Sequence, residues 1–349
     1  MAMNDSLAVG MLEATQLTRA GRVLEATAAI QRALSQQPRS TGRVIEGEFS
    51  RVEEPSQRQA ANDALEGRAG EFIAGSYTHQ HGTRPYKLYI PTGYATGKAL
   101  PLVVMLHGCT QNPDDFAAGT RMNLLAEERQ CFVLYPAQTR SANRSQCWNW
   151  FKRAHQRRDK GEPAIIVGMT REVLKRYGID AHKVYVAGLS AGGAMAAVMG
   201  AAYPDVYAAV GVHSGLPVGS AHDLPSAFAA MRGAPPASPS GAAAGRVVPA
   251  IVFHGDRDAT VHPRNGEQVA TQCVNRNESI DVVVERGQAP GGHTYTRSIH
   301  RDAAGRVVLE HWEVHGAGHA WCGGSARGSY TDPRGPDAAR EMLRFFLRS

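Results

Sequence analysis

Short runs of hydrophobic residues alternate along this chain with longer stretches in which apolar positions recur every three or four residues. The runs predict β-strands at residues 75–79, 84–90, 102–107, 132–135, 184–187, 208–212, 250–254, 281–285, 294–300 and 307–314. The longer stretches predict helices at residues 114–130, 164–177, 191–202, 265–273 and 337–347. Strands that alternate with helices are typical of a parallel sheet covered on both faces. We therefore predict an α/β fold with a mostly parallel, doubly wound sheet.

The same pattern divides the chain into parts. Residues 1–36 contain two short helical patterns broken at Gly21, which predict an N-terminal helical hairpin. Residues 37–70 have little periodicity and many Gln, Arg, Ser, Glu, Gly and Pro, so we expect a flexible linker. The compact domain then covers residues 71–349. Within it, residues 217–246 are rich in Ala, Pro, Ser and Gly and predict a surface excursion or a cap over a pocket.

Composition and charge exclude several classes of protein. The 349 residues are 43% hydrophobic and 20% charged, as in an ordinary globular protein. The net charge is +6, but Lys and Arg are scattered, so we expect no nucleic-acid partner. No apolar segment reaches the roughly 18 residues that span a bilayer, so we expect no transmembrane segment. Residues 1–20 contain Asp5 and Glu13 and lack an apolar block, so we expect no signal peptide, which slightly favours the cytoplasm and leaves localisation and oligomeric state open.

The candidate chemistry centres on the segment Gly188-Leu189-Ser190-Ala191-Gly192, between a predicted strand and a run of small residues that predicts a helix. Glycines two residues to either side of a serine permit the sharp strand-to-helix turn of a nucleophile elbow. Such a turn would lift the serine hydroxyl above the sheet. Because Gly and Ser are common, the motif gains weight only from this context.

A serine nucleophile needs a base and a third group that orients the base. In enzymes built on such an elbow, the acid and then the histidine follow the serine along the chain. Two aspartates come directly after the predicted strand 250–254. Asp258 is the expected orienter, and Asp256 is the alternative because it sits in the tight turn; both could also do no more than shape that turn.

The base is expected in a loop after the last strand. His319, in a glycine-flanked loop, fits this position, and His315 is its rival in the same segment. A neutral imidazole can accept the serine proton near pH 7. Three other histidines are expected to shape turns or to lie in the core, namely His107, His213 and His254.

Acyl transfer also needs hydrogen-bond donors for the negative charge that develops on the carbonyl oxygen. The Ala191 N–H, directly after the serine, is one expected donor. The second is expected in the loop after strand 102–107, and we assign the Cys109 N–H to it. The Cys109 thiol could itself be a nucleophile, but no histidine stands in a recognised arrangement with it.

Five segments are jointly specific, namely RPYKLYIP at 84–91, LHGCTQ at 106–111, CWNWF at 147–151, GLSAGGAM at 188–195 and GHAW at 318–321. Together they resemble the poly(3-hydroxybutyrate) depolymerase family of esterases, which is similar to the feruloyl and acetylxylan esterases of carbohydrate esterase family 1. The resemblance covers residues 71–349 and implies an α/β-hydrolase fold, a serine esterase mechanism, no metal and no cofactor. Ser190, Asp258 and His319 fall on the family's triad motifs.

The resemblance leaves the ester open. We expect a carboxylic-ester hydrolase that acts through an acyl-enzyme on hydroxyalkanoate oligomers, polyester or small aryl and alkyl esters. A feruloyl or acetylxylan esterase is the alternative within the family, and a peptidase on the same fold is a less favoured one. The third interpretation, from another class, is a protein that binds a polymer granule or a partner through the helices of residues 1–36.

Aromatic residues and cysteines near these motifs give two further expectations. Trp148 and Trp321 are guessed to line the substrate groove, because aromatic faces suit a polyester chain or a feruloyl ring; a place in the core is equally open. The five cysteines are too few and too irregularly spaced for a disulfide scaffold or a zinc site. Cys109 and Cys322 lie in the two loops that the mechanism brings together, and we hypothesise a disulfide between them in an oxidising compartment.

Overall fold

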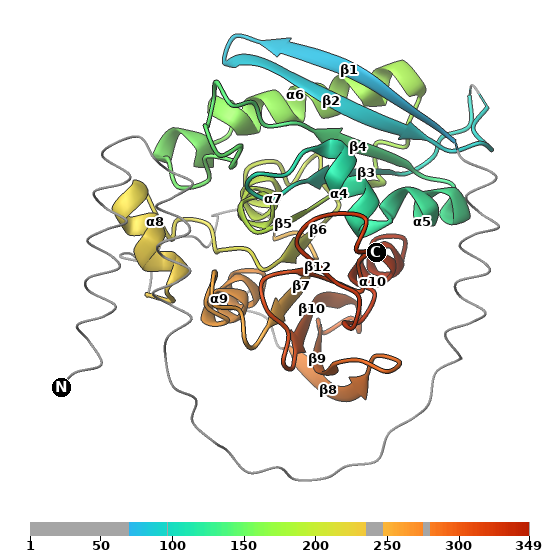
Figure 1. Ribbon diagram of the computed structural model, residues 1–349. Coiled ribbons are helices and arrows are strands. Elements are labelled where there is room, and N and C mark those ends of the chain that lie inside the picture. The colour runs from blue at the N-terminus through green and yellow to red at the C-terminus, as the bar shows by residue number, and fades with distance from the viewer. Residues whose placement is uncertain (1–69, 96, 235–246, 275–279, 349) are drawn as a thin grey trace, which may run out of the picture. The chain divides into compact units, whose positions relative to one another are not determined.

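The computed structural model describes residues 70–348 with the exception of 96, 235–246 and 275–279 (Figure 1). The predicted N-terminal hairpin and nearly all of the predicted linker lie outside the described residues, as does part of the predicted excursion. Within the described ranges, no helix has both the length and the apolar character that crossing a membrane requires.

A ten-stranded sheet forms the centre of the described structure. Its strands lie in the order β1 (Glu71–His79), β2 (Gly82–Ile90), β4 (Phe132–Pro136), β3 (Leu102–Leu106), β5 (Val184–Leu189), β6 (Ala209–His213), β7 (Ala250–Gly255), β10 (Val307–Val314), β9 (Thr294–Arg301) and β8 (Asp281–Gln288). The strands from β4 to β10 in this order are parallel, and antiparallel strands extend the sheet at both edges (Figure 1). A small separate pair consists of β11 (Trp321–Cys322) and β12 (Thr331–Asp332).

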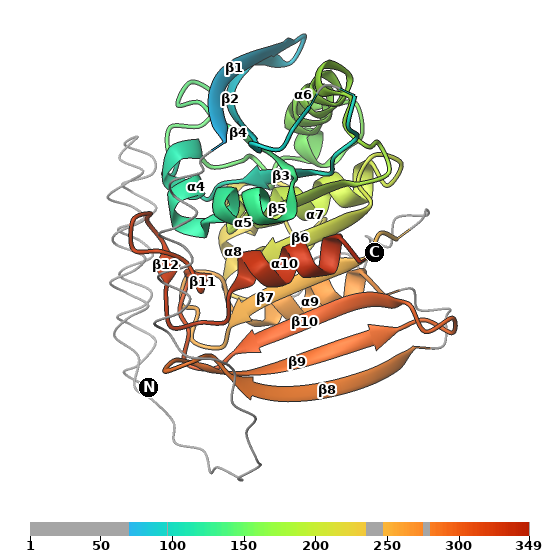
Figure 2. The same cartoon turned by 90° about the vertical axis from the view of Figure 1, so that its right-hand side faces the viewer.

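Helices cover both faces of this sheet. One apolar core holds buried side chains of α6 (Gly161–Tyr177), α7 (Ala191–Ala202), α8 (Leu224–Met231) and α9 (Arg264–Gln272). The other core holds those of α4 (Pro113–Thr120), α5 (Met122–Arg129) and α10 (Ala338–Phe346). A short 3-10 helix, η1 (Arg153–Gln156), precedes α6. Figure 2 shows α10 lying over β6 and β7, which it contacts.

The central strands explain why the apolar runs in the sequence are continuous. Every residue of β3 and β5 is buried. Successive side chains point to opposite faces of a strand, so Val104 and Val186 enter one core while Val103 and Tyr185 enter the other. Continuous apolar runs of this kind are typical of parallel sheets, whose strands are covered on both faces.

The strand register brings the candidate loops to one edge of the sheet. Leu106 at the end of β3 pairs with Gly188 in β5, and His254 in β7 pairs with Glu313 in β10. The loops that follow these parallel strands therefore leave from the same edge, where α/β proteins place their ligands. These loops carry the candidate serine, acid and histidine.

The predicted α/β architecture is confirmed, and a strand is present at each predicted position. The helix predicted over residues 114–130 is instead two helices, α4 and α5, because Arg121 between them takes a left-handed conformation with φ 55°. The Arg121 guanidinium donates a hydrogen bond to the Gly323 carbonyl at 2.8 Å, which fixes this break. The described part of residues 217–246 includes α8, which begins with a capping box formed by Asp223 and Ser226.

Candidate active site

Ser190 stands on a strained turn between β5 and α7. Its φ of 58° and ψ of −119° lie in a region that residues other than glycine rarely adopt. The Ser190 N–H donates to the His213 carbonyl at the end of β6 over 2.9 Å, and α7 begins at the next residue. The side chain is only half-buried. This is the backbone conformation that a nucleophile elbow requires.

The elbow needs its glycines because the backbone of β3 lies directly against it. A Cβ atom at Gly192 would lie 1.9 Å from the Leu106 carbonyl oxygen, and one at Gly188 would lie 2.4 Å from the Gly192 backbone. Both distances are far inside van der Waals contact, so only glycine permits this approach. The same approach brings the loop after β3 beside the serine, since a Cβ atom at Gly108 would lie 3.6 Å from Ser190 Cβ.

Asp258 and His319 form a hydrogen-bonded pair on the loops after β7 and β10. The distance between His319 Nδ1 and Asp258 Oδ2 is 2.7 Å. The Asp258 side chain is 0% exposed and that of His319 is 11% exposed. Because an ionised carboxylate only accepts hydrogen bonds, Nδ1 carries the proton and the neutral ring keeps an acceptor at Nε2. An imidazole fixed in this tautomer has the form in which it can accept a proton from a serine.

Several interactions keep Asp258 ionised. Its Oδ1 accepts the backbone N–H groups of Thr260 at 2.9 Å and Val261 at 2.8 Å. His254 Nε2 lies 3.4 Å from its Oδ2 and 2.8 Å from the Val261 carbonyl oxygen. Burial by itself raises the pKa of the Asp258 carboxyl, but the interactions with His319 and His254 outweigh it and hold the pKa well below its usual range.

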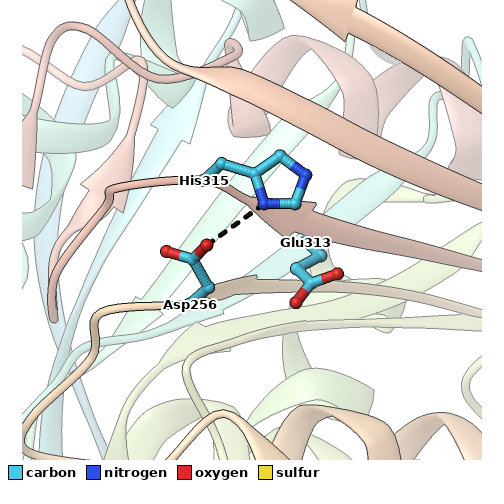
Figure 3. Close-up of side chains that lie close together, drawn as sticks. All are labelled: Asp256, Glu313 and His315. Atoms are coloured by element: carbon cyan, nitrogen blue, oxygen red, sulfur yellow. Dashed lines mark hydrogen bonds and ion pairs between the residues drawn. The ribbon is translucent and has the colours of Figure 1, made fainter. Parts of the chain in front are cut away.

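The rival residues Asp256 and His315 pair with each other. His315 Nδ1 lies 3.1 Å from Asp256 Oδ2, and Asp256 Oδ1 accepts the Gly316 N–H at 2.7 Å. Figure 3 shows this pair with Glu313 beside it. The two residues that the sequence left as alternatives therefore form a separate, solvent-accessible pair, in contrast to the buried carboxylate of Asp258.

Among the described residues, a surface cluster around this pair could hold a metal ion. Asp256, Glu313 and His315 each offer a ligand atom, and these atoms lie within 4.8 Å of one another (Figure 3). Two carboxylates and one imidazole suit a divalent cation. The Thr296 hydroxyl, 2.9 Å from His315 Nε2, helps to orient the ring. The cluster shares no residue with the Asp258 and His319 pair, and the expectation of chemistry without a metal stays a prediction.

His213, at the end of β6, connects the elbow to the histidine loop. Besides its carbonyl bond to the Ser190 N–H, its Nε2 accepts the Cys322 N–H at 3.0 Å. Its ring stacks on Trp321 with centroids 5.1 Å apart. Burial lowers the pKa of His213 to about 3, so the ring is neutral, in agreement with the predicted core role. Ser190 Oγ and His319 make no direct hydrogen bond in the part of the chain that the structure describes.

Two backbone N–H groups near the serine are available to an oxyanion. Ala191 is the first residue of α7, so its N–H has no acceptor inside the helix. The Cys109 N–H makes no hydrogen bond with any described residue, although both of its neighbours do. The Gly108 N–H donates to a glutamine side chain at 2.9 Å and the Thr110 N–H to the Ser145 carbonyl at 2.7 Å. The loop is therefore fixed on both sides of an unused donor, as an oxyanion site requires.

The predicted disulfide between Cys109 and Cys322 is wrong. Cys109 is bonded to Cys147, with Cα atoms 4.1 Å apart, and Cys322 is a free, buried thiol. The Cys322 side chain packs against Gly335: a Cβ atom added at Gly335 would lie 3.1 Å from the Cys322 sulfur. Burial raises the pKa of this thiol. The disulfide therefore ties the oxyanion loop to the loop after β4, and not to the histidine loop.

A buried polar network under the loop after β4 was not predicted, although Arg84, His107 and Asn149 lie in three of the segments that carry the family resemblance. Glu162 in α6 accepts the Asn149 N–H at 2.7 Å and a Gln138 Nε2–H at 2.5 Å. Gln138 Oε1 accepts from Arg84 Nε at 2.9 Å, and the Gln138 N–H donates to His107 Nε2 at 3.1 Å. Burial lowers the pKa of His107 to about 4, so its ring is neutral. The protonated Nδ1 of this ring donates to the Gly108 carbonyl at 2.7 Å. This network fixes the start of the oxyanion loop.

The predicted substrate contacts Trp148 and Trp321 lie in the core instead. Their side chains are 0% and 1% exposed. Trp148 packs beside His107, and Trp321 packs between His213 and Phe116. A side chain without exposed surface cannot touch a substrate in this structure, so the prediction is corrected: both tryptophans support the loops from below.

These features define a class of protein. A serine on a strained turn after a central parallel strand, followed along the chain by a carboxylate and an imidazole that pair at the same sheet edge, is the arrangement of the α/β-hydrolase fold. Residues 84–294 match the family model described as Esterase PHB depolymerase, and the chain belongs to this family. The match includes Ser190 and Asp258, and His319 lies beyond it.

Individual relatives agree with this family. The chain is 33% identical over 254 residues to poly(3-hydroxyalkanoate) depolymerase C of Paucimonas lemoignei, which covers 68% of this chain and 59% of the relative. It is 30% identical over 210 residues to feruloyl esterase B of Neurospora crassa, covering 54% of this chain and 68% of the relative. The solved acetyl xylan esterase from Aspergillus awamori shares the fold, with TM-score 0.56, 19% identity, and coverage of 79% of this chain and 100% of that chain. The chain spans about half the length of the depolymerase relatives that it matches.

We expect Gly192→Ala to destabilise the protein by at least about 2 kcal/mol, because the new methyl group would collide with the Leu106 carbonyl oxygen. The helix preference of alanine would instead stabilise the protein by about 1 kcal/mol. The sign of the change in the free energy of unfolding therefore shows whether the collision or the helix preference dominates. Gly318→Ala is the control, since a Cβ atom there meets nothing within 4 Å. Chemical denaturation measures the difference, and a Gly192→Ala protein as stable as the wild type would contradict this packing.

Loss of the Cys109–Cys147 disulfide is expected to lower the free energy of unfolding by about 4 kcal/mol, the loop-closure value for a sequence separation of 38. The double variant Cys109→Ser/Cys147→Ser is compared with the wild type by denaturation without reductant. Cys273→Ser is the control, because it replaces a free cysteine. Thiol titration of the denatured wild type should count three free thiols. A count of five would mean that the disulfide does not form.

Proposed function

We propose that this protein is a serine carboxylic-ester hydrolase that works through an acyl-enzyme. The observation that carries the proposal is the 2.7 Å hydrogen bond between the buried Asp258 and His319, at the sheet edge where Ser190 stands on its strained turn. A carboxylate buried against an imidazole that retains contact with solvent is typical of functional sites. Membership of the Esterase PHB depolymerase family supports the same reaction.

In the first half of the reaction, Ser190 Oγ attacks the carbonyl carbon of the ester. Hydrogen bonds between such groups often tighten only in the substrate complex, where His319 Nε2 takes the serine proton. The resulting imidazolium is stabilised by the Asp258 carboxylate beside Nδ1. The N–H groups of Ala191 and Cys109 donate to the oxyanion, and the N-terminus of α7 adds positive potential.

In the second half, the tetrahedral intermediate loses the alcohol. The bond between the carbonyl carbon and the alcohol oxygen breaks, and His319 gives its proton to that oxygen. A water molecule then transfers a proton to His319 Nε2 and attacks the acyl carbon on Ser190. Collapse of the second intermediate releases the carboxylic acid, and Ser190 Oγ regains its proton.

For the substrate, we propose hydroxyalkanoate oligomers or polyester, with small aryl and alkyl esters as further substrates. The relative named poly(3-hydroxyalkanoate) depolymerase C supports this choice. Feruloyl or acetylxylan esters are the alternative, supported by relatives named feruloyl esterase B and acetylxylan esterase A. Rates for hydroxybutyrate oligomers, methyl ferulate and acetylated xylan, measured on one preparation, decide between the two.

We expect Ser190→Ala to lower kcat for 4-nitrophenyl acetate by a factor of about 10⁶, because no other group takes the place of Oγ in the acyl-enzyme. Initial rates of nitrophenolate release measure this loss. Ser76→Ala, which changes an exposed serine in β1, is the control and should leave kcat within about twofold. Substantial activity in Ser190→Ala would assign the nucleophile to another residue.

Asp258→Asn is expected to lower kcat by a factor of about 10⁴ with little change in shape, because an amide no longer fixes the His319 tautomer or stabilises its cation. Asp256→Asn is the matched control and should change kcat by less than about threefold, since Asp256 pairs with His315 instead. Equal losses in the two variants would contradict the assignment of the acid.

The pH dependence of stability gives a second readout for Asp258. Its pKa in the folded protein lies below that of an unfolded aspartate, so the ionised group stabilises the folded state at pH above about 4, and the stabilisation is lost as the pH falls further. The difference between wild type and Asp258→Asn in free energy of unfolding should therefore narrow from about pH 5 to about pH 3. A difference that widens on acidification would mean that Asp258 is not held as a carboxylate.

A further inference from the structure

Tyr330 is the most exposed aromatic residue among Phe, Tyr and Trp in the part of the chain that the structure describes. Tyr330 is 44% exposed, whereas the tryptophans of the motifs are buried. An exposed aromatic ring beside a reactive centre is a common contact for ligands, since it offers a large, stiff, apolar face with a polar end. No motif in the sequence singled out this tyrosine.

Hydrogen bonds place Tyr330 between the oxyanion loop and the histidine loop. Its hydroxyl lies 3.2 Å from Thr110 Oγ1, one residue after the proposed oxyanion donor Cys109. Its carbonyl accepts the Trp321 N–H at 2.7 Å, two residues after His319. Tyr330 therefore bridges the two loops that carry the donor and the base, which is the link that the wrong disulfide prediction had given to Cys322.

The backbone around Tyr330 is strained and firmly held. Tyr330 has φ 53° and Thr110 has φ 65°, both in the left-handed region that costs a tyrosine or threonine free energy. The preceding residue, Ser329, donates its N–H to Asp115 Oδ1 at 2.8 Å. The loop between β11 and β12 also lies against α4 (Figure 2), where a Cβ atom at Gly328 would stand 2.4 Å from the Asp115 carbonyl oxygen. Strain of this kind on an exposed aromatic residue is a reason to ask whether the position has a function.

We propose that Tyr330 is a substrate-binding residue whose ring contacts the apolar chain that flanks the scissile ester bond. The substrate class that it favours is an ester with an extended chain, such as a hydroxyalkanoate oligomer, over an ester of two or three carbons. The hydroxyl bond to Thr110 orients the ring, and the ring supplies the contact. This inference rests on the proposed esterase function of the same site.

The test compares two esters whose hydrolysis is followed by titration of the released acid. The linear trimer of 3-hydroxybutyrate has chain on both sides of an ester bond, whereas methyl acetate has almost none. Tyr330→Ala is expected to raise KM for the trimer about tenfold and to change kcat/KM for methyl acetate by less than about twofold, because only the trimer reaches the ring. Tyr330→Phe keeps the ring and should keep KM for the trimer within about threefold.

Val284→Ala is the matched control, because it removes exposed apolar surface from the edge strand β8 and should leave both substrates unchanged. Thermal unfolding of each variant checks that it is folded. Equal losses for trimer and methyl acetate in Tyr330→Ala and Tyr330→Phe would mean that Tyr330 only positions the oxyanion loop through Thr110. Unchanged kinetics in Tyr330→Ala would also overturn the proposal.

A binding experiment separates this inference from the proposed function. Calorimetry with the trimer compares Ser190→Ala with Ser190→Ala/Tyr330→Ala, so that no turnover is needed. The double variant is expected to bind about tenfold more weakly, and equal dissociation constants would overturn the role of Tyr330. Failure of the esterase function would appear differently, as hydrolysis that is absent in the wild type or independent of Ser190.

Discussion

The close approach of the turn between β5 and α7 to the backbone of β3 is the constraint on which the rest of the site depends. The Leu106 carbonyl oxygen occupies the space that any side chain at position 192 would need. Because β3 and β5 are also paired along their length, the loop after β3 cannot move away from Ser190 without opening the sheet. This backbone contact therefore links the strained conformation of the serine to the position of the loop after β3.

Burial then gives the histidines of this region different roles. His107 and His213 are buried where their pKa values are lowered to about 4 and about 3, and each uses a neutral ring to accept a backbone N–H. His319 keeps contact with solvent and has a carboxylate at Nδ1. The two buried rings are structural because they cannot take a proton near neutral pH. His319 instead keeps exposed surface and a carboxylate partner, the arrangement that the proposed base requires.

Much of this arrangement could be predicted from the sequence because it follows from local rules. Continuous apolar runs identify strands that are buried on both faces, and the glycines at 188 and 192 reflect a backbone contact that leaves no other choice. The tight turn at Asp256 favours Asp258 as the acid but leaves Asp256 open as the alternative. Both aspartates follow β7 within three residues, and only the fold buries one of them against His319.

Two predictions were wrong, the disulfide between Cys109 and Cys322 and the substrate contacts of two tryptophans. Both errors concern which side chains of a loop point into the core. Cys147 lies in a loop without periodicity, so nothing in the pattern placed it near Cys109. Trp148, Trp321 and Tyr330 are all aromatic, but the two tryptophans are buried and the tyrosine is exposed. The conformation of the loops decides this difference, and residue propensities do not determine that conformation. The left-handed backbone of Tyr330 is one of those turns.

The site consists of two halves that are fixed independently. The proposed nucleophile and the proposed oxyanion donors are held by the contact with β3, the Cys109–Cys147 disulfide and the network under it. Asp258 is held by N–H groups of its own loop. Noncovalent contacts of His213 and Tyr330 link the halves. We expect Ser190 Oγ and His319 Nε2 to form their hydrogen bond in the substrate complex, where such contacts often tighten.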